Sequence, residues 1–365
     1  MSDSNKILLS LLLEQVSGLG QYRIKNLVSI YDSIDHVEKA TEKNLSKVEG
    51  IGEQSAAEIK RTVFDYKKAE RVISQIQQHN AEIIGFWSEN YPKRLKVLDG
   101  MPVLLYFKGN REVLNSEGVA VVGTRTPSSY GKSVTEFFTK GLVQSGLTIY
   151  SGFARGVDTI AHSVSLSEGG STIAVLGSGF NNIYPSENKN LLPKIFEKGG
   201  ILTEFHPDTK PDGKNFPQRN RIISGLALGS LVVEAAETGG ALITAAYALE
   251  QNKEVFAVPG EIFADRSKGT NRLIMNGSAK LVLTPEDILS EINFTKSETK
   301  IPTKPMPELS IFELPVYEKL SSKPIHVDEL ATLLGLPVSE LLIQLLGLEF
   351  KSVVRQLPGK YFVRI

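Results

Sequence analysis

From residue 118 to about residue 292, short continuous apolar runs alternate with longer segments of helical periodicity. A continuous apolar run indicates a strand buried on both faces, as in a parallel sheet. The segments 129–144 and 240–251 separate such runs and repeat apolar residues with the period of a helix. This alternation predicts a doubly wound, Rossmann-like α/β fold with a parallel sheet. Its predicted strands cover residues 118–123, 147–152, 171–179, 200–205, 230–236, 254–260 and 279–283.

The two ends of the chain have different patterns. Residues 16–27 and 48–59 both read hydrophobic, any residue, Gly, hydrophobic, Gly before a helical segment, which is typical of a helix-hairpin-helix (SAM-like) unit. Three helical patterns followed by a hairpin in the tail predict a winged helix. We therefore expect a helical domain over 1–80, the Rossmann-like domain over 81–292, a polar, proline-punctuated linker over 293–308 and the winged helix over 309–365.

The overall composition limits the function classes only weakly. The 41 Lys and Arg residues balance 41 Asp and Glu residues, which argues against a protein that coats polyanions with its whole surface but leaves room for a local basic patch. The chain has no cysteine, so disulfides and thiolate metal sites are excluded, and a reducing compartment is expected. No run approaches the ~20 apolar residues of a transmembrane helix. We expect a cytoplasmic protein with no membrane partner.

Basic and aromatic residues follow the predicted strands at their carboxyl ends, where open α/β sheets bind their ligands. Phosphate grips beside an aromatic ring suit a single-stranded nucleic acid, whose backbone meets the cations while a base stacks. The candidate DNA-binding residues are Gly123, Arg125 and Ser128 after the first strand, Gly152 and Arg155 after the second, and Lys214, Phe216, Arg219, Asn220 and Arg221 after the fourth. The opposing interpretation is that the arginines pair with Asp158, Glu204 and Glu234 and brace the loops.

The sequence offers little for catalysis. The five histidines show no metal-ligand spacing, and neither a GxSxG nor a GxxxxGK[ST] motif occurs, so we predict no metal, no cofactor and no catalytic residue. Asp158 and His162 would share a helix face, which is more typical of a hydrogen-bonded brace than of a catalytic pair. The predicted third helix of the winged helix, 337–350, has no lysine or arginine, so a protein–protein role is expected there.

Several of these loops, taken together and in order, resemble the DNA-processing protein A (DprA/Smf) family of bacterial natural transformation. The motifs are "YPKRL", "VAVVGTRTPSSYG", "SGFARGVDTIAH", "VLGSGFNNIYPSEN", "FPQRNRIISGL", "VVEAAETGGALITAAYALEQNKEVFAVPG" and "GTNRLIMNG". The family's DNA-gripping arginine falls on Arg125 and its FPxRNR segment on Phe216, Arg219, Asn220 and Arg221. The chain departs from the family pattern at Gly239 and Asn181, where serine and aspartate are common.

This resemblance implies a dimeric, non-catalytic protein that binds and protects single-stranded DNA. It also implies delivery of the strand to a RecA-type recombinase and displacement of single-strand-binding protein, in transformation or homologous recombination. We place the self-association surface around Leu273 and Ile274. Two alternatives stay open: a nucleotide phosphoribohydrolase of the lysine-decarboxylase-like class, although the turn at 238–241 lacks that class's PGGxGT pattern, and a hub that joins recombinase and DNA through the two end domains.

Overall fold

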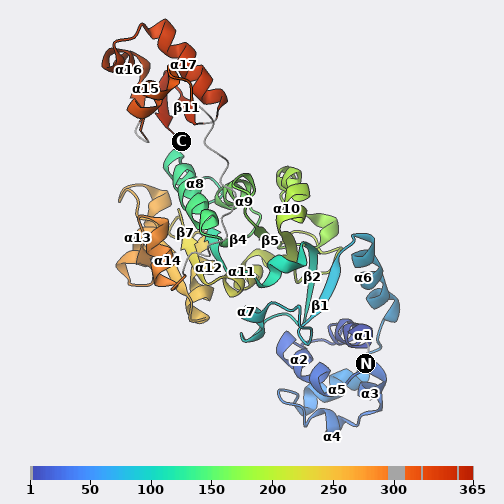
Figure 1. Ribbon diagram of the computed structural model, residues 1–365. Coiled ribbons are helices and arrows are strands. Elements are labelled where there is room, and N and C mark those ends of the chain that lie inside the picture. The colour runs from blue at the N-terminus through green and yellow to red at the C-terminus, as the bar shows by residue number, and fades with distance from the viewer. Residues whose placement is uncertain (1–2, 295–308, 322–323, 352, 365) are drawn as a thin grey trace. The chain divides into compact units, whose positions relative to one another are not determined.

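The computed structural model describes residues 3–294, 309–321, 324–351 and 353–364 (Figure 1). The chain divides into two compact units, residues 1–303 and 304–365. The expected linker, 293–308, lies outside the described residues except for its first two positions. We describe each unit by itself.

Within residues 3–294, nine strands form one sheet in the order β1-β2-β6-β5-β4-β3-β7-β8-β9. The strands from β3 to β9 are parallel to one another, whereas β1 pairs with β2, and β2 with β6, in antiparallel register. The sheet is therefore mixed and mostly parallel, and its antiparallel edge was not expected from the sequence. The strands are β1 Glu82–Gly85, β2 Leu104–Gly109, β3 Gly118–Val122, β4 Thr148–Ser151, β5 Thr172–Val175, β6 Gly200–Thr203, β7 Gly229–Val232, β8 Glu254–Ala257 and β9 Lys280–Leu281.

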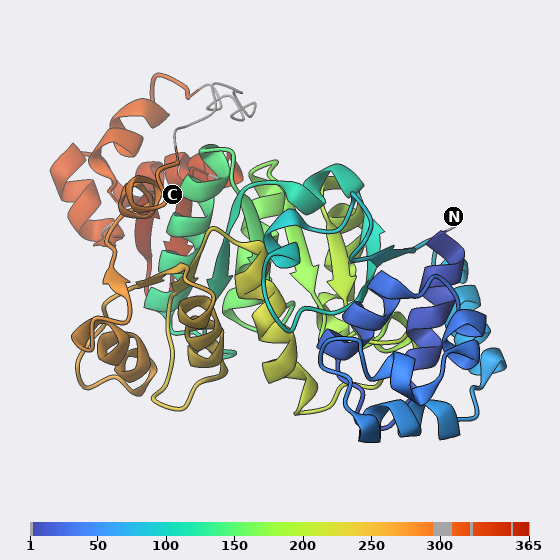
Figure 2. The same cartoon turned by 90° about the horizontal axis from the view of Figure 1, so that it is seen from below.

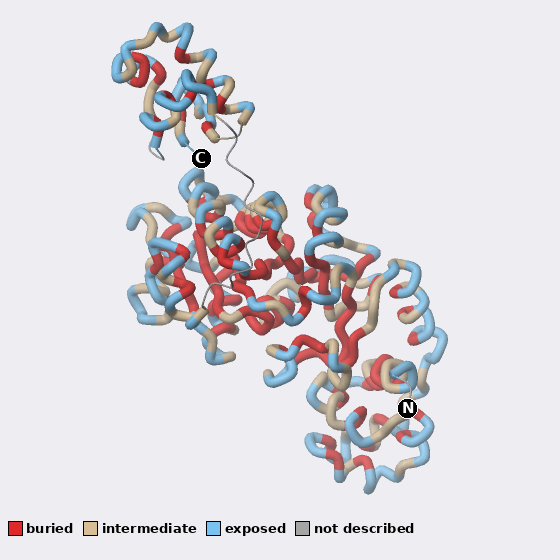
Figure 3. The backbone as a smooth tube through the Cα atoms, viewed as in Figure 1, coloured by how far each residue is buried: buried red, intermediate tan, exposed pale blue. Residues whose placement is uncertain are grey.

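Helices cover both faces of this sheet, which explains why its strands are continuously apolar. Successive residues of a strand point to opposite faces: Val119 and Val121 pack toward α8 (Ser129–Gln144), α9 (Val157–Ser167) and α14 (Pro285–Glu291). Ala120 and Val122 pack toward α11 (Asn215–Leu226) and α12 (Gly240–Glu250) on the other face. Figure 3 shows the resulting buried centre. The remaining helices here are α7 Lys93–Lys96, α10 Leu192–Lys198 and α13 Lys268–Met275, with 3-10 turns at Arg111–Asn115, Phe180–Asn182, Ser186–Leu191 and Asp265–Ser267.

The strand order reverses between β3 and β7. From β3 the chain winds outward through β4, β5 and β6 to one side, and then returns to build β7, β8 and β9 on the other side. At such a reversal the loops after neighbouring strands diverge to opposite faces and leave a crevice at the carboxyl edge. The predicted doubly wound architecture is confirmed, and its crevice lies between the loops that follow β3 and β7.

The N-terminal helices lie beside the antiparallel edge of the sheet, as Figures 1 and 2 both show. Side chains from these helices share one hydrophobic core with Val103, Leu104 and Tyr106 in and before β2. The two predicted glycine turns each precede a helix, α2 after Gly20 and α5 after Gly52, which confirms the helix-hairpin-helix pattern. The helices are α1 Asp3–Leu13, α2 Gln21–Ile30, α3 Ile34–Lys39, α4 Glu42–Leu45, α5 Glu53–Arg61 and α6 Tyr66–Gln78.

The second unit is the predicted winged helix and has a core of its own. Its helices are α15 Glu313–Lys319, α16 Val327–Leu334 and α17 Val338–Phe350, and its sheet has the order β10-β12-β11, with β10 Ile325–His326, β11 Val354–Leu357 and β12 Tyr361–Arg364. Among the described residues no single helix is long and apolar enough to cross a membrane, and α16 with α17 meets that test only as a pair bent by 106°.

Candidate nucleic-acid interface

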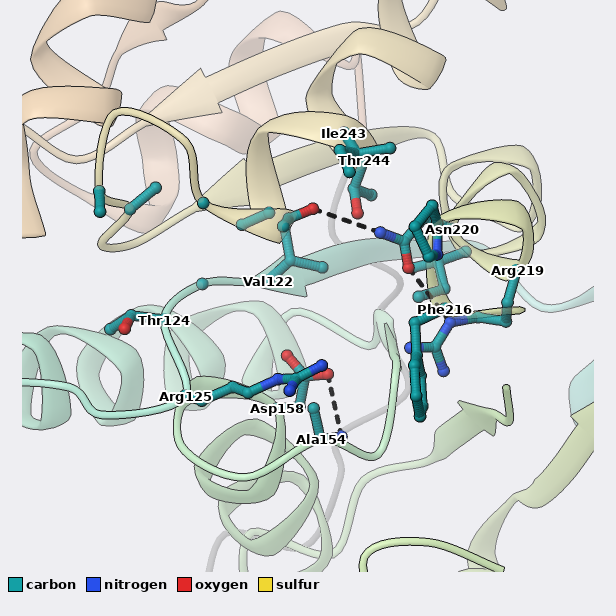
Figure 4. A pocket seen from close by; sticks show the side chains of 18 of the residues that line it. Val122, Thr124, Arg125, Ala154, Asp158, Phe216, Arg219, Asn220, Ile243 and Thr244 are labelled. Atoms are coloured by element: carbon teal, nitrogen blue, oxygen red, sulfur yellow. Dashed lines mark hydrogen bonds between the residues drawn. The ribbon is translucent and has the colours of Figure 1, made fainter. Parts of the chain in front are cut away.

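A cavity of about 470 Å³ lies at the carboxyl edge of the sheet, beside the crevice between β3 and β7. Residues after β3, β4 and β7 line it together with the first turns of α11 and α12 (Figure 4). Its position is the one at which open α/β sheets bind ligands. The lining residues are Val122, Gly123, Thr124, Arg125, Ala154, Asp158, Gly213, Phe216, Pro217, Arg219, Asn220, Ile223, Ala235, Ala236, Gly239, Gly240, Ala241, Ile243 and Thr244.

Arg125 is the exposed cation of this cavity. It lies in the loop between β3 and α8, and its guanidinium carbon is 5.5 Å from the centroid of the Phe216 ring. Within the described part of the chain no carboxylate lies within 4.0 Å of its guanidinium nitrogens. A cation held over an aromatic face by a weak contact and left without a counter-ion is available to an anionic ligand.

Arg219 has a different environment, because it is only 4 % exposed. Its guanidinium donates to the carbonyl of Gly152 at 2.6 Å, to the carbonyl of Val175 and to Asn220 Oδ1 at 3.2 Å. Burial lowers the pKa of Arg219 to about 10, while the nearby Asp158 carboxylate favours the charged form. Arg219 therefore joins the ends of β4 and β5 and forms part of the cavity wall. This agrees with the opposing interpretation of the sequence, in which the arginines brace the loops.

Arg221 lies outside the cavity, contrary to the expectation that it would stand beside Arg125. Its guanidinium forms an ion pair with Glu204 at 2.5 Å, and both side chains are largely buried. Residues two apart on a helix point in nearly opposite directions, so Arg219 and Arg221 leave α11 on different sides. The two arginines are close together in the sequence, but their side chains lie on different sides of the helix.

Ser128 is occupied by the protein's own carboxylate rather than being open to a phosphate. It begins α8, where the Gly131 amide donates to its hydroxyl at 3.0 Å. The Ser128 amide and hydroxyl donate to the two carboxylate oxygens of Glu234, at 2.9 and 2.5 Å. Glu234 follows β7 and is 3 % exposed. An internal anion thus fills the position at the start of α8 where a Rossmann fold usually holds phosphate.

The other predicted residues divide between the lining and the rim. Gly123 lines the cavity, and Asn220 also lines it while its amide donates to the Gly240 carbonyl at 3.3 Å. At Gly152 a Cβ atom would lie 2.6 Å from the Arg219 guanidinium, so only glycine fits the brace. Lys214 is exposed at the start of α11, beside the lining residue Gly213. Arg155 is exposed and pairs with Glu187, its Nε lying 3.0 Å from Oε1.

Asp158 and Tyr184 lie near this cavity although neither was among the predicted DNA-binding residues. Asp158 accepts the amides of Gly152 and Ala154 at 3.0 and 3.1 Å, and burial raises its pKa. Tyr184 follows β5, and its ring centroid lies 6.2 Å from that of Phe216. The sequence signal for Tyr184 was an aromatic residue in a loop at the carboxyl edge of the sheet.

Two further predictions concern other parts of this unit. His162 is buried, and its Nδ1 lies 2.7 Å from Thr172 Oγ1, so the structure shows no bond that would join it to Asp158. Leu273 and Ile274 on α13 are half-buried and pack against the core of the sheet domain. The more exposed apolar side chain of that helix is Met275, at 78 %.

Comparison with known families matches each part of the chain. The family model described as DNA recombination-mediator protein A matches residues 82–293. The DprA winged helix domain matches residues 300–360, and a SAM-like helix-hairpin-helix tandem matches residues 10–63.

Individual relatives agree with these matches. Protein Smf of Escherichia coli is 41% identical over 307 residues, which cover 82% of this chain and 81% of that protein. The X-ray structure of DNA processing protein A from Streptococcus pneumoniae has a TM-score of 0.67 at 34% identity and covers 80% of this chain and 99% of that one. The protein of the same name from Helicobacter pylori, whose structure was described for its single-stranded DNA binding mode, has a TM-score of 0.53 at 29% identity over 58% of this chain and 95% of that one. By these matches, the chain belongs to the DNA-processing protein A (DprA/Smf) family.

Proposed function

We propose that this protein binds single-stranded DNA in the cavity at the carboxyl edge of its sheet and catalyses no reaction on it. The observation that carries the proposal is the Arg125–Phe216 pair, in which an unpaired guanidinium lies over a half-exposed aromatic ring. A phosphate attracts the guanidinium, and an unstacked base packs on the ring.

The shape and surroundings of the cavity support a single strand over a duplex. Cavities of about 300–1,000 Å³ enclose small organic groups, and a base reaches such a space only when it is unpaired and turned out of its stack. Three glycines, Gly123, Gly239 and Gly240, line the cavity and present backbone rather than side chains to a base. We therefore expect little sequence preference. The single-stranded DNA binding described for the Helicobacter pylori relative supports the same ligand class.

The first experiment compares binding of labelled oligo-dT and of a matched duplex as salt is varied. The wild type is expected to prefer the single strand, with a log–log salt slope of about −0.7 for each phosphate neutralised. Arg125→Glu should weaken binding at least about tenfold, because it replaces attraction by repulsion at the phosphate.

The matched control is Lys198→Glu, which makes the same charge change at the end of α10, just before β6 and therefore at the opposite edge of the sheet. It should bind nearly as the wild type does. Equal binding by Arg125→Glu and wild type would show that DNA does not bind in this cavity. The two end domains would then be the candidate binding sites.

An enzymatic role is disfavoured by the way the Rossmann phosphate position is filled. A nucleotide phosphoribohydrolase needs that position or a glycine turn to hold the phosphate of its substrate, together with an acidic catalyst. Here Glu234 occupies the start of α8. Incubation with AMP should release no adenine, and release that depends on Glu234 or on the 238–241 turn would restore the enzyme interpretation.

We further propose that the bound strand is passed to a RecA-type recombinase and that single-strand-binding protein is displaced in the process. Family membership supports this role. The wild type should shorten the lag before recombinase ATP hydrolysis on strands coated with single-strand-binding protein, and Arg125→Glu should not. An unchanged lag in the presence of the wild type would contradict loading.

Dimerisation through the region of α13 is the last part of the proposal. Leu273 and Ile274 face the core, but Met275 on the same helix and Leu283 beyond β9 are 78 % and 65 % exposed. Met275→Glu leaves the core intact and should shift sedimentation toward the monomer, together with a loss of avidity on long strands but not on short ones. A dimer that persists in Met275→Glu would place the interface elsewhere.

A further inference from the structure

Two aromatic rings and two guanidinium groups form a row along the carboxyl edge of the sheet. In order the row contains Arg125, Phe216, Tyr184 and Arg155. Arg125 lies 5.5 Å from the Phe216 centroid, the two rings are 6.2 Å apart with their planes inclined by 55°, and Arg155 lies 5.8 Å from the Tyr184 centroid. The row begins in the cavity described above and continues past Phe216 to residues that do not line that cavity.

Both rings are held in place by their surroundings although they are open to solvent. Phe216 packs against the backbone at Gly177, where an added Cβ atom would lie only 2.7 Å from the Phe216 ring. Tyr184 is 39 % exposed, while its neighbour Pro185 is buried and its neighbour Ile183 packs against the core. Within the described residues no hydrogen bond engages the Tyr184 hydroxyl. An aromatic ring fixed at a ligand-binding edge, with no structural partner for its polar end, is suited to contact a ligand.

Arg155 at the end of the row can be recruited at little cost. Its ion pair with Glu187 is exposed on both sides, at 54 % and 56 %, and exposed pairs contribute little to stability. A phosphate that competes with Glu187 gains a guanidinium that is already positioned beside Tyr184. When a base takes the face of the Tyr184 ring, the exposed Arg155 guanidinium is free to turn to the adjoining phosphate.

We propose that Tyr184 is a second base-stacking platform and that the site holds two neighbouring nucleotides, one base on Phe216 and the next on Tyr184, with Arg155 on the phosphate beyond. This rests on the proposed single-strand binding. The 6.2 Å between the rings exceeds the ~3.4 Å between stacked nucleotides. Because the two ring planes are inclined by 55°, bases that stack on them are not parallel to each other, and the strand is unstacked as it leaves the cavity.

The test uses the full chain with Tyr184→Ala and Tyr184→Phe, and a short oligo-dT in which each position in turn is made abasic. Tyr184→Ala should weaken binding of the intact oligo-dT by about 5- to 150-fold, the range for losing one stacked base, whereas Tyr184→Phe keeps the ring and should bind as the wild type does. Abasic substitution should be costly at two positions in the wild type and at one in Tyr184→Ala.

The outcomes separate this inference from the function on which it rests. If Tyr184→Ala binds like the wild type while Arg125→Glu does not, the second platform is wrong and the single-strand site stands. If Tyr184→Ala and Arg125→Glu both bind like the wild type, the proposed single-strand site itself is wrong. If Tyr184→Phe loses as much affinity as Tyr184→Ala, the hydroxyl acts and stacking is excluded. Circular dichroism checks that both variants fold, as expected for an exposed side chain.

Discussion

The arginines around the cavity show how burial assigns different tasks to identical side chains. Arg125 is exposed and unpaired within the described residues, so its charge is available to a ligand. Arg219 is buried and its donors are used by carbonyls of the protein, while Arg221 is neutralised by Glu204. A buried charge without partners costs several kcal/mol, so these partners keep the Arg219 and Arg221 side chains in place.

Arg219→Met should therefore destabilise the fold rather than alter ligand contact alone. The substitution leaves the carbonyls of Gly152 and Val175 without their buried donor, and it leaves the buried carboxylate of Asp158 without its nearby positive charge. We expect the free energy of unfolding to fall by about 3–5 kcal/mol, measured by urea denaturation, against less than about 0.5 kcal/mol for Arg125→Met. Equal stability of the two variants would show that the buried guanidinium is dispensable.

His162 makes the stability of the protein depend on pH. Burial lowers the pKa of His162 to about 3 from an ordinary value of 6.5, so the folded protein excludes a proton that the unfolded chain accepts. The contribution of the neutral His162 to the free energy of unfolding is fully present above pH 6.5 and is lost as the pH drops toward 3. At pH 5 this residue should lower the free energy of unfolding by about 2 kcal/mol.

The measurement is urea denaturation of the wild type and of His162→Gln at pH 7 and at pH 5. Because glutamine does not titrate, the variant should lose this part of the pH dependence and keep the part that comes from carboxylates. Parallel pH profiles would mean that the imidazole is protonated in the folded state.

At the scale of elements, the start of α8 shows how one residue changes what a fold can bind. Glu234 follows β7, on the other side of the strand-order reversal, and its carboxylate accepts the amide and the hydroxyl of Ser128, the N-cap of a 16-residue helix. The helix dipole and the Ser128 hydroxyl both favour a negative charge there. The protein thus supplies its own anion, and the ligand cavity is built from the starts of α11 and α12 instead.

Glu234→Gln tests this account, because it keeps the size of the side chain and removes its charge. The free energy of unfolding should fall by about 1–2 kcal/mol, while binding of oligo-dT stays near the wild-type value. Glu237→Gln, which alters an exposed pair with Arg272, is the control and should change stability by less than about 1 kcal/mol. A gain of DNA affinity in Glu234→Gln would reveal a phosphate site that the carboxylate blocks.

At the scale of the whole molecule, the cavity and the winged helix belong to different units. Each residue that lines the cavity lies in the unit 1–303, and the winged helix has a separate core. The face of α17 that would read DNA in a winged helix carries exposed Ile343, Leu346 and Phe350 and no lysine or arginine. An apolar face of this kind is suited to a protein partner.

The fragment 1–303 should consequently bind short oligo-dT within about twofold of the full chain, because it contains every residue that lines the cavity. Fluorescence anisotropy with full chain and fragment measures this, and Arg125→Glu in the fragment should abolish the binding that remains. A large loss of affinity in the fragment would assign part of the interface to residues 304–365.

The local pattern of the sequence determined the elements of this protein. Apolar runs marked β3 to β9, helical periodicity marked α8 and α12, and the strand ends pointed to Gly123, Arg125, Phe216 and Asn220 as cavity residues. These features depend on interactions between residues close together in the chain, so a single sequence contains them.

Only the tertiary structure decided which side chains meet. Four features join segments that are far apart in the chain. They are the antiparallel edge, the contact of Ser128 with Glu234, the burial of Arg219 and the approach of Tyr184 to Phe216. Such contacts depend on the order of strands in the sheet and on the direction in which each helix presents its side chains. Burial then determined which charges are neutralised within the protein and which remain for a ligand, because the cost of an unpaired charge arises only where water is excluded.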